Sequence, residues 1–351
     1  MSNIVSNSSL SLNPKVLLVK LSSLGDVLHN LPIVWDVRAR FPDAQIDWVV
    51  EEGYVHLLEP LMSTSAFQGI DRIIPFGLRR WKRNIFKLST WKQFFAFKKE
   101  LQVRTYDIVI ETQGLVKSAI VCALANKSSD VVVAGLANAT EFSGYEPIVK
   151  TFYNHLVQVP IQCHAVDRSR RVMCSALDMP LIERAVSPQF YPAEFVASIP
   201  RHSVSGIKVP YVLFFHSTAR EAKRWSNANW LTLGKALSDK GYQVVLPWGS
   251  SSEKAISILL SSQIPGSLVP LAFSIEQAFS VIAGAALTVG VDTGLTHLAA
   301  VLNQPTVEIY CDSPRWKTEG YWSSSIENIG DIQKPPQVQE VLDAALRLLT
   351  Q

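Results

Sequence analysis

The sequence predicts an α/β protein made of two doubly wound domains, and two observations support this. Short apolar runs alternate with helical patterns along two separate stretches of the chain, which is typical of parallel sheets covered by helices. The chain has 351 residues, of which 48% are hydrophobic and 18% charged, and this length exceeds what a single compact core usually holds. We therefore expect an N-terminal domain over residues 15–195 and a C-terminal domain over residues 205–335.

The first stretch opens with the apolar residues 16–19, which are typical of a parallel strand buried on both faces. A helical pattern runs from Val27 and ends near Arg40, because Pro42 cannot continue a helix. Further strands are predicted over residues 46–50, 70–74 and 106–110.

Residues 188–210 interrupt the pattern with Pro, Ser and short polar pieces, so we place the domain linker there. The strand at 211–215 restarts the alternation, and the amphipathic segment Val338–Leu349 predicts a final helix that packs back toward the N-terminal domain. Parallel sheets bind ligands beyond the carboxyl ends of their strands, so two facing domains would form a cleft with one substrate on each wall. The other strands of this stretch are predicted over residues 243–246, 287–290 and 306–310, and the helices over 230–237, 275–283 and 296–302.

Composition excludes several classes of protein. The longest uncharged run, residues 255–275, contains Pro265, Pro270 and several polar residues, so we expect no segment to cross a membrane. Residues 1–14 are rich in Ser and Asn and lack the basic region of a secretory signal, so we interpret them as a disordered leader. Four scattered cysteines form no Cys-x-x-Cys pair, which argues against zinc and disulfides and favours a cytoplasmic location. The net charge of +3 does not by itself indicate a nucleic acid partner.

The segment from Lys20 to Asp26 lies between the first strand and the first helix. Gly25 permits a tight turn there, and Ser22 and Ser23 offer hydroxyl groups. Asp26 stands at the start of the helix, where capping is a common use of aspartate. The other interpretation is a general base, because a carboxylate beyond the carboxyl end of a strand would face the expected cleft.

A basic loop follows the strand at 211–215. Thr218 and Lys223 supply a hydroxyl and an ammonium group that can hold phosphate oxygens, although many basic loops are simply solvated. The chain contains no Gly-x-x-x-x-Gly-Lys-Ser/Thr motif, which argues against a nucleoside triphosphatase of that type.

The segment that follows residues 287–290 is the most informative. Asp292, Thr293 and Gly294 form a predicted turn, and the helix after them leaves free backbone amides that suit a diphosphate. His297 in the first turn of this helix either packs in the core or contacts the ligand.

Glu253 follows the predicted strand at 243–246. A carboxylate in that place can accept hydrogen bonds from both hydroxyls of a ribose. The chain has no Gly-x-Gly-x-x-Gly motif, which argues against a dinucleotide-dependent dehydrogenase.

A basic and aromatic stretch runs from Arg79 to Arg104, and Glu100 is its only acidic residue. A solvated helix with one side packed on the core would explain the aromatic residues but not the imbalance of charge. We favour an anionic partner, which could be a membrane surface, a phosphorylated lipid head group or single-stranded nucleic acid.

Seven motifs follow one another between Lys15 and Tyr310. They are Val19-Lys-Leu-Ser-Ser-Leu-Gly-Asp-Val-Leu-His29, Asp47-Trp-Val-Val-Glu-Glu52, Arg79-Arg-Trp81, Gln113-Gly-Leu-Val-Lys-Ser118, His164-Ala-Val-Asp-Arg168, Leu246-Pro-Trp-Gly249 and Asp292-Thr-Gly-Leu-Thr-His-Leu-Ala-Ala300. In this order they closely resemble the heptosyltransferase I family of lipopolysaccharide ADP-heptose transferases.

The resemblance implies a GT-B glycosyltransferase with two facing Rossmann-like domains and an interdomain cleft. Such an enzyme moves L-glycero-D-manno-heptose from ADP-L-glycero-β-D-manno-heptose to the inner Kdo of Kdo2-lipid A with inversion, at the cytoplasmic face of the inner membrane. No nucleic acid partner is implied. Because no Asp-x-Asp pair is apparent, we also expect no metal or other cofactor. Heptosyltransferase II, with a different acceptor, and a non-catalytic nucleotide-sugar-binding protein are the alternatives.

The resemblance also assigns roles by position. Asp26 corresponds to the catalytic base, and Lys223 with the helix amides would stabilise the departing diphosphate once the cleft closes. The acceptor residues implied are Ser23, Arg79, Arg80, Lys82, Arg83, Gln113 and Lys117. The donor residues implied are Thr218, Ala219, Lys223, Glu253, Phe273, Asp292, Thr293, Gly294 and His297.

Two of these donor positions depart from the family pattern. Ala219 stands where a second Thr is common, and Phe273 stands where a Met can lie against adenine. If the missing Thr hydroxyl contributes one hydrogen bond, diphosphate binding should weaken by about 0.5–1.5 kcal/mol.

Overall fold

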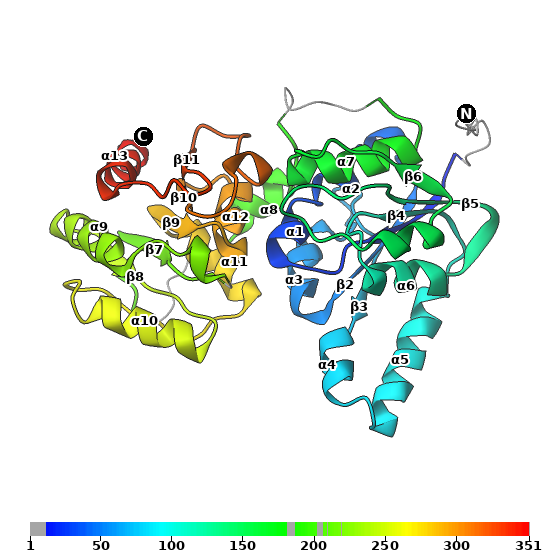
Figure 1. The fold of residues 1–351 in the computed structure, drawn as a ribbon, viewed down its shortest axis with the longest axis horizontal. Helices are drawn as coiled ribbons and strands as arrows, with labels where there is room; N and C mark the ends of the chain where they lie inside the picture. The colour runs from blue at the N-terminus through cyan, green and yellow to red at the C-terminus, as the bar shows by residue number, and fades with distance from the viewer. Residues whose placement is uncertain (1–11, 181–186, 202–205, 209, 219, 351) are drawn as a thin grey trace. The chain divides into compact units, whose positions relative to one another are not determined.

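The computed structural model describes residues 12–180, 187–201, 206–208, 210–218 and 220–350. The chain forms two compact units, Met1–Gln189 and Phe190–Gln351, each containing a parallel sheet covered by helices, so the predicted fold class is confirmed (Figure 1). Most of the leader expected over residues 1–14, and Ala219, lie outside the described residues.

The division between the units falls near the start of the expected linker, so the C-terminal unit begins earlier than predicted. The short helix α8, Ala193–Ser198, belongs to this unit. The reason is aromatic packing, because the rings of Tyr191 and Phe195 lie 5.6 and 5.4 Å from the ring of Phe279.

The N-terminal unit contains six parallel strands in the order β3-β2-β1-β4-β5-β6. The chain builds outward from β1 to β3 and then returns to the other side of β1, so the strand order reverses between β1 and β4. Ligand crevices form at such a switch point, beyond the carboxyl ends of the strands. The strands are β1 (Lys15–Val19), β2 (Gln45–Glu51), β3 (Arg72–Phe76), β4 (Tyr106–Glu111), β5 (Lys127–Leu136) and β6 (His155–Val157).

Two predictions for this unit need correction. The single helix expected between Val27 and Arg40 is broken in two, because Pro32 lacks the N–H group that a continuous helix requires and instead opens the second helix. The strand expected over residues 70–74 starts two residues later, and Ile70 forms an isolated bridge with Met62.

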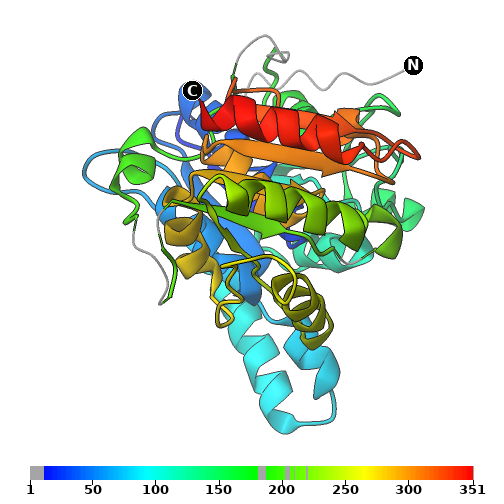
Figure 2. The same ribbon diagram turned by 90° about the vertical axis from the view of Figure 1, so that its left-hand side faces the viewer.

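The helices α4 (Leu78–Arg83) and α5 (Leu88–Leu101) form a hairpin that projects from the sheet of the N-terminal unit (Figures 1 and 2). Trp81 and Phe97 anchor its base, since both are buried and both pack against the ring of Phe76. The other helices of this unit are α1 (Leu24–Leu28), α2 (Pro32–Arg40), α3 (Val55–Leu58), α6 (Val116–Leu124) and α7 (Ala165–Ala176).

The C-terminal unit contains five parallel strands in the order β11-β10-β9-β7-β8, so its strand order reverses between β7 and β9. The strands are β7 (Tyr211–Phe215), β8 (Gln243–Val245), β9 (Leu287–Val291), β10 (Thr306–Tyr310) and β11 (Ile326–Gly330). The remaining helices are α9 (Asn227–Asp239), α10 (Ser251–Ser261), α11 (Ile275–Ala283), α12 (Gly294–Val301) and α13 (Val338–Leu349).

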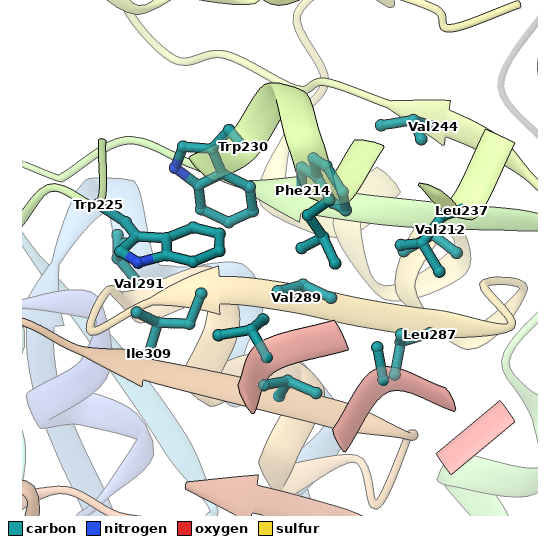
Figure 3. Packing of buried hydrophobic residues seen from close by; sticks show 14 of the residues in the cluster. Val212, Phe214, Trp225, Trp230, Leu237, Val244, Leu287, Val289, Val291 and Ile309 are labelled. Atoms are coloured by element: carbon teal, nitrogen blue, oxygen red, sulfur yellow. The ribbon is translucent and has the colours of Figure 1, made fainter. Parts of the chain in front are cut away.

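The core of the C-terminal unit contains a group of aromatic residues (Figure 3). The ring of Trp230 lies 4.8 Å from Phe214 and 5.1 Å from Trp225, and the Trp225 indole donates a 2.9 Å hydrogen bond to the carbonyl of Pro336. The apolar face of α13, including Val341, lies in this core, where α13 covers α9, β9 and β10. The packing of this helix toward the N-terminal unit stays a prediction. No helix in the described part of the chain has the length and apolar character of a bilayer crossing.

Candidate active site

Asp26 lies at the switch point of the N-terminal unit, in the first turn of α1. Its Oδ2 accepts hydrogen bonds from the backbone N–H of Ser23 at 3.0 Å and from the Ser23 hydroxyl at 2.8 Å. Oδ1 lies 3.9 Å from the Lys20 ammonium, and the side chain is 39% exposed. Asp26 therefore caps its helix with one oxygen, and its other oxygen accepts no hydrogen bond from a described residue.

The surroundings of Asp26 favour its ionised form. The partial burial of the carboxyl would by itself raise its pKa, but the positive charges of Lys20 and Arg168 hold the pKa well below its usual range. The two hydrogen bonds from Ser23 act in the same direction. Asp26 is thus a carboxylate throughout the neutral pH range. Lys20 and Arg168 were not predicted as site residues, because only the fold brings them near Asp26.

Gln113 and Lys117 follow β4 and lie on the other side of the same switch point. The amide of Gln113 accepts from the backbone of Leu21 at 3.0 Å and donates to the Ser22 hydroxyl at 3.3 Å. The ammonium of Lys117 donates to the same hydroxyl at 2.6 Å. The structure therefore brings together Ser23, Asp26, Gln113 and Lys117, as the resemblance implies.

Arg79 and Arg80 are tied to acidic residues at the end of β2. Arg79 forms an ion pair of 2.7 Å with Glu51, which also lies 3.3 Å from the Lys117 ammonium. Arg80 pairs with Glu52. Glu51 is buried and Arg79 is exposed, so Arg79 is positioned close to Lys117 and can still reach a ligand.

Lys82 and Arg83 are exposed and form no ion pair with an acid among the described residues. They lie farther along α4 than the two arginines that pair with acids. The expected acceptor cluster therefore divides into a part joined to Asp26 by continuous contacts and a part that is available to an anionic partner.

Asp292 lies at the switch point of the C-terminal unit, directly after β9. Both of its oxygens are engaged: Oδ1 accepts from the His297 ring at 2.9 Å and from the Thr318 hydroxyl at 3.2 Å, and Oδ2 pairs with the Lys223 ammonium. Although burial would raise the pKa of Asp292, His297 and Lys223 hold it well below its usual range.

Glu308 on β10 completes this network, and we did not predict it. Its Oε1 lies 2.9 Å from His297 Nδ1, its Oε2 accepts from the Tyr310 hydroxyl at 3.0 Å, and the residue is fully buried. Burial would lower the pKa of His297, but Glu308 and Asp292 raise it to about 10. His297 is therefore a buried cation between two carboxylates. One feature of the sequence could have identified Glu308: it is the only acidic residue in the otherwise uncharged strand β10, which is buried throughout.

The start of α12 is where the sequence predicts a diphosphate site, and its backbone N–H groups lack a side-chain cap. Gly294 begins the helix and Thr293 precedes it without forming a side-chain cap, so the first backbone N–H groups of the helix receive no bond from the Thr293 hydroxyl. Lys223 extends toward the same turn, because it bonds to Asp292. Thr218 follows the neighbouring strand β7 and is largely buried.

The other two donor residues lie after β8 and before α11. Glu253 caps its own helix, because its Oε2 accepts from the backbone N–H groups of Gly249 at 2.6 Å and Ser250 at 3.1 Å. Phe273 is half-buried just before the N-cap of α11. In the described part of the chain, neither residue forms a hydrogen bond or ion pair with Asp292, although both follow strands of the same sheet.

Within the described residues, no cluster of three His, Cys, Asp or Glu side chains is arranged to hold a metal ion. Charged groups at this site instead bond to one another, as Lys223, Asp292 and His297 do.

Comparison with known proteins gives consistent matches. The chain matches the sequence model described as glycosyltransferase family 9 (heptosyltransferase) over residues 94–344. It is 35% identical to a lipopolysaccharide heptosyltransferase 1 of Pseudomonas aeruginosa over 322 residues, which cover 92% of this chain and 85% of the relative. It is 26% identical to a lipopolysaccharide heptosyltransferase 2 of Escherichia coli over 303 residues, which cover 84% of this chain and 82% of the relative.

Solved structures agree. The E. coli heptosyltransferase WaaC with ADP matches with a TM-score of 0.79 and 30% identity, covering 95% of this chain and 99% of that chain. The structure of WaaC with ADP-2-deoxy-2-fluoro heptose matches with a TM-score of 0.73 and 31% identity, covering 96% and 98%.

Two parallel α/β units, each with charged side chains at its switch point, together with these matches define a glycosyltransferase of the GT-B fold class. The predicted fold and enzyme class are thereby confirmed. The chain belongs to glycosyltransferase family 9, among the lipopolysaccharide heptosyltransferases 1.

Proposed function

We propose that the protein transfers L-glycero-D-manno-heptose from ADP-heptose to the inner Kdo of Kdo2-lipid A, with inversion of the anomeric carbon. The observation that carries the chemistry is Asp26, an ionised carboxylate with one available oxygen at the N-terminal switch point. The acceptor choice is supported by 35% identity to a heptosyltransferase 1 against 26% identity to a heptosyltransferase 2.

On the acceptor side, Asp26 takes the proton from the attacking Kdo hydroxyl while that oxygen forms its bond to the anomeric carbon. Ser23 holds Oδ2 through two hydrogen bonds, so Oδ1 remains available to accept the proton. Lys117 and the exposed cations of α4 attract the carboxylates and phosphates of the acceptor.

On the donor side, the bond from the anomeric carbon to the diphosphate breaks and ADP leaves. Negative charge grows on the leaving phosphate, and Lys223 and the first amides of α12 stabilise it. Asp292 would repel this charge if it stood alone. It is offset by the His297 cation, and Asp292 and His297 therefore act as positioning residues that hold Lys223 beside the helix.

We further propose that the protein acts at the cytoplasmic face of the inner membrane, to which it binds peripherally. The exposed surface of the α4–α5 hairpin supports this, because it combines apolar side chains such as Phe86 with Lys87 and Lys92. Basic residues close to an anionic membrane contribute about 1 kcal/mol each to binding.

We also propose that transfer requires no divalent metal, because Lys223, the α12 amides and the Asp26 carboxylate account for both charge changes. Turnover should be the same after exhaustive treatment with a chelator. Loss of turnover on chelation and its recovery with magnesium would contradict this.

The central experiment is to measure ADP release from ADP-L-glycero-β-D-manno-heptose with and without O-deacylated Kdo2-lipid A, and in a parallel reaction with an acceptor that already carries the first heptose. We expect ADP release that depends on the Kdo-terminated acceptor. Release only with the heptosylated acceptor would assign the heptosyltransferase II activity instead. Failure to bind ADP-heptose would overturn the donor assignment.

A further inference from the structure

A cavity of about 590 Å³ lies between the α4–α5 hairpin and α6 in the N-terminal unit. This volume falls within the range of ordinary small-molecule pockets. Its walls are mainly apolar and include Leu78, Trp81, Ile85, Trp91, Phe94 and Ile120. We call it the hairpin cavity.

The polar groups around the hairpin cavity are few, and two of them are already engaged. The Thr90 hydroxyl donates to the Asn84 carbonyl at 2.7 Å, and the Glu146 carboxylate accepts from the backbone N–H of Val116 at 2.5 Å. A peptide would bring N–H and C=O groups that need partners in such a place. A hydrocarbon chain would not.

The mouth of the hairpin cavity is both apolar and cationic. Ile85 and Trp91 line the cavity and are still 50% and 48% exposed, so they stand where it opens to solvent. Lys82 also lines the cavity and forms no ion pair among the described residues. The charge of the hairpin opposes the docking of a second, equally basic copy and favours an anionic amphiphile.

A hydrogen bond of Lys117 links the wall of the hairpin cavity to the loop that carries Asp26. Lys117 lines the cavity, and its ammonium lies 2.6 Å from the Ser22 hydroxyl. The next residue, Ser23, holds Asp26 through two hydrogen bonds. A molecule with an anionic sugar head and an acyl tail could therefore place the head at Asp26 and the tail in the cavity.

We infer that the hairpin cavity holds an acyl chain of the acceptor during transfer. This inference rests on the proposed function, since it names the part of the acceptor that the hairpin binds. Ile85 and Ile120 form walls of the chain site on α4 and α6, and Lys82 and Lys117 contact anionic groups at its rim.

The test measures the binding of two acceptors by calorimetry in the absence of donor. One is O-deacylated Kdo2-lipid A, which keeps its amide-linked chains and is used below its critical micelle concentration. The other is the fully deacylated molecule. Ile85→Asp places a charge in the cavity wall at a half-exposed position. Phe86→Asp is the matched control, because Phe86 is the adjacent residue, is 100% exposed and does not line the cavity.

We expect Ile85→Asp to weaken binding of the acylated acceptor on the order of tenfold, as loss of burial of a few methylene groups would do, and to leave binding of the deacylated acceptor unchanged. Ile120→Trp should do the same by filling the cavity from α6. The wild type should show a more negative heat capacity change with the acylated acceptor.

Three results would overturn the inference. The first is that both cavity variants bind the acylated acceptor as tightly as the wild type does. The second is an equal loss of affinity in Phe86→Asp, which would indicate a general contact with membrane or micelle, and the third is an equal loss of affinity for the deacylated acceptor. A different result would contradict the proposed function: wild-type protein that binds the acceptor but releases no ADP.

Discussion

Asp26 and Asp292 are the same residue type at corresponding places, each at the switch point of a parallel sheet, but their side chains differ in exposure. The Asp26 side chain is 39% exposed and that of Asp292 is 7% exposed. One oxygen of Asp26 accepts no hydrogen bond from a described residue, whereas both oxygens of Asp292 are engaged by His297, Lys223 and Thr318. Position at the edge of a sheet therefore does not by itself decide the role of an aspartate. The available oxygen suits Asp26 to accept a proton, and the saturated one suits Asp292 to position a cation.

The strongest test of this difference is Asp26→Asn, which keeps the shape of the side chain and removes its basicity. We expect turnover to fall by about 10²–10⁴-fold, the usual contribution of a general base, and the affinity for ADP-heptose to stay the same. Rates are measured as ADP release and affinity by calorimetry. Asp43→Asn, at an exposed position in the same unit, is the control. Turnover within tenfold of wild type would reduce Asp26 to a helix cap.

Glu308→Gln tests the buried network around Asp292. This variant leaves the His297 cation without one of its two buried carboxylates, so we expect the free energy of unfolding to fall by about 3–5 kcal/mol. Urea unfolding followed by tryptophan fluorescence measures the change, because Trp225 and Trp230 lie in the core of the same unit. Glu327→Gln, which removes a solvent-screened pair with Arg347 at the surface, should leave the free energy of unfolding nearly unchanged. Equal effects of the two variants would contradict the role of the buried network.

The two sites should also respond to pH on opposite sides of neutrality. His297 has a pKa of about 10 in the folded unit against 6.5 in the unfolded chain, so its stabilisation is complete below pH 6.5 and is lost as the pH rises toward 10. Between pH 7 and 9 this one group should lower the free energy of unfolding by about 1.4 kcal/mol per pH unit. Asp26, whose pKa is lowered, should lose its contribution only below pH 3.8.

The measurement is the urea midpoint at pH 7, 8 and 9 for the wild type and for His297→Gln. The slope between pH 7 and 9 should be smaller in the variant. A slope that is identical in the two proteins would show that His297 does not titrate as its surroundings indicate.

The smallest effect is expected for Lys223→Met. Loss of one charge-assisted hydrogen bond should weaken ADP binding by about ten- to a hundredfold, while the acceptor affinity stays the same. Lys235→Met, at an exposed position of α9, is the control in calorimetric titrations with ADP. Unchanged ADP affinity in Lys223→Met would mean that this ammonium serves only Asp292.

Much of the fold could be predicted from the sequence because apolar runs such as 211–215 must be buried on both faces, and their spacing determines the element order. The same local reasoning found the capping position of Asp26 and the turn before α12. It failed where the packing of one element on another creates a charged pair. Glu308 meets His297 only when α12 packs on β10, and Glu51 at the end of β2 meets Arg79 only when α4 is placed beside it. Pro32 itself could have indicated that the helix is divided there, but the hydrophobic pattern continues across Pro32 and predicts a single helix.

The hydrogen bond from Trp225 to Pro336 has a consequence for shortened chains. Trp225 lies two residues after Lys223, and Pro336 immediately precedes the segment that enters α13. A protein cut before residue 336 would lose the anchor of the loop that carries Lys223, together with the apolar cover that Val341 and Leu348 provide. Proteolysis at this end would therefore reduce activity from a distance, by loosening the loop that carries Lys223 and not by removing a contact with substrate.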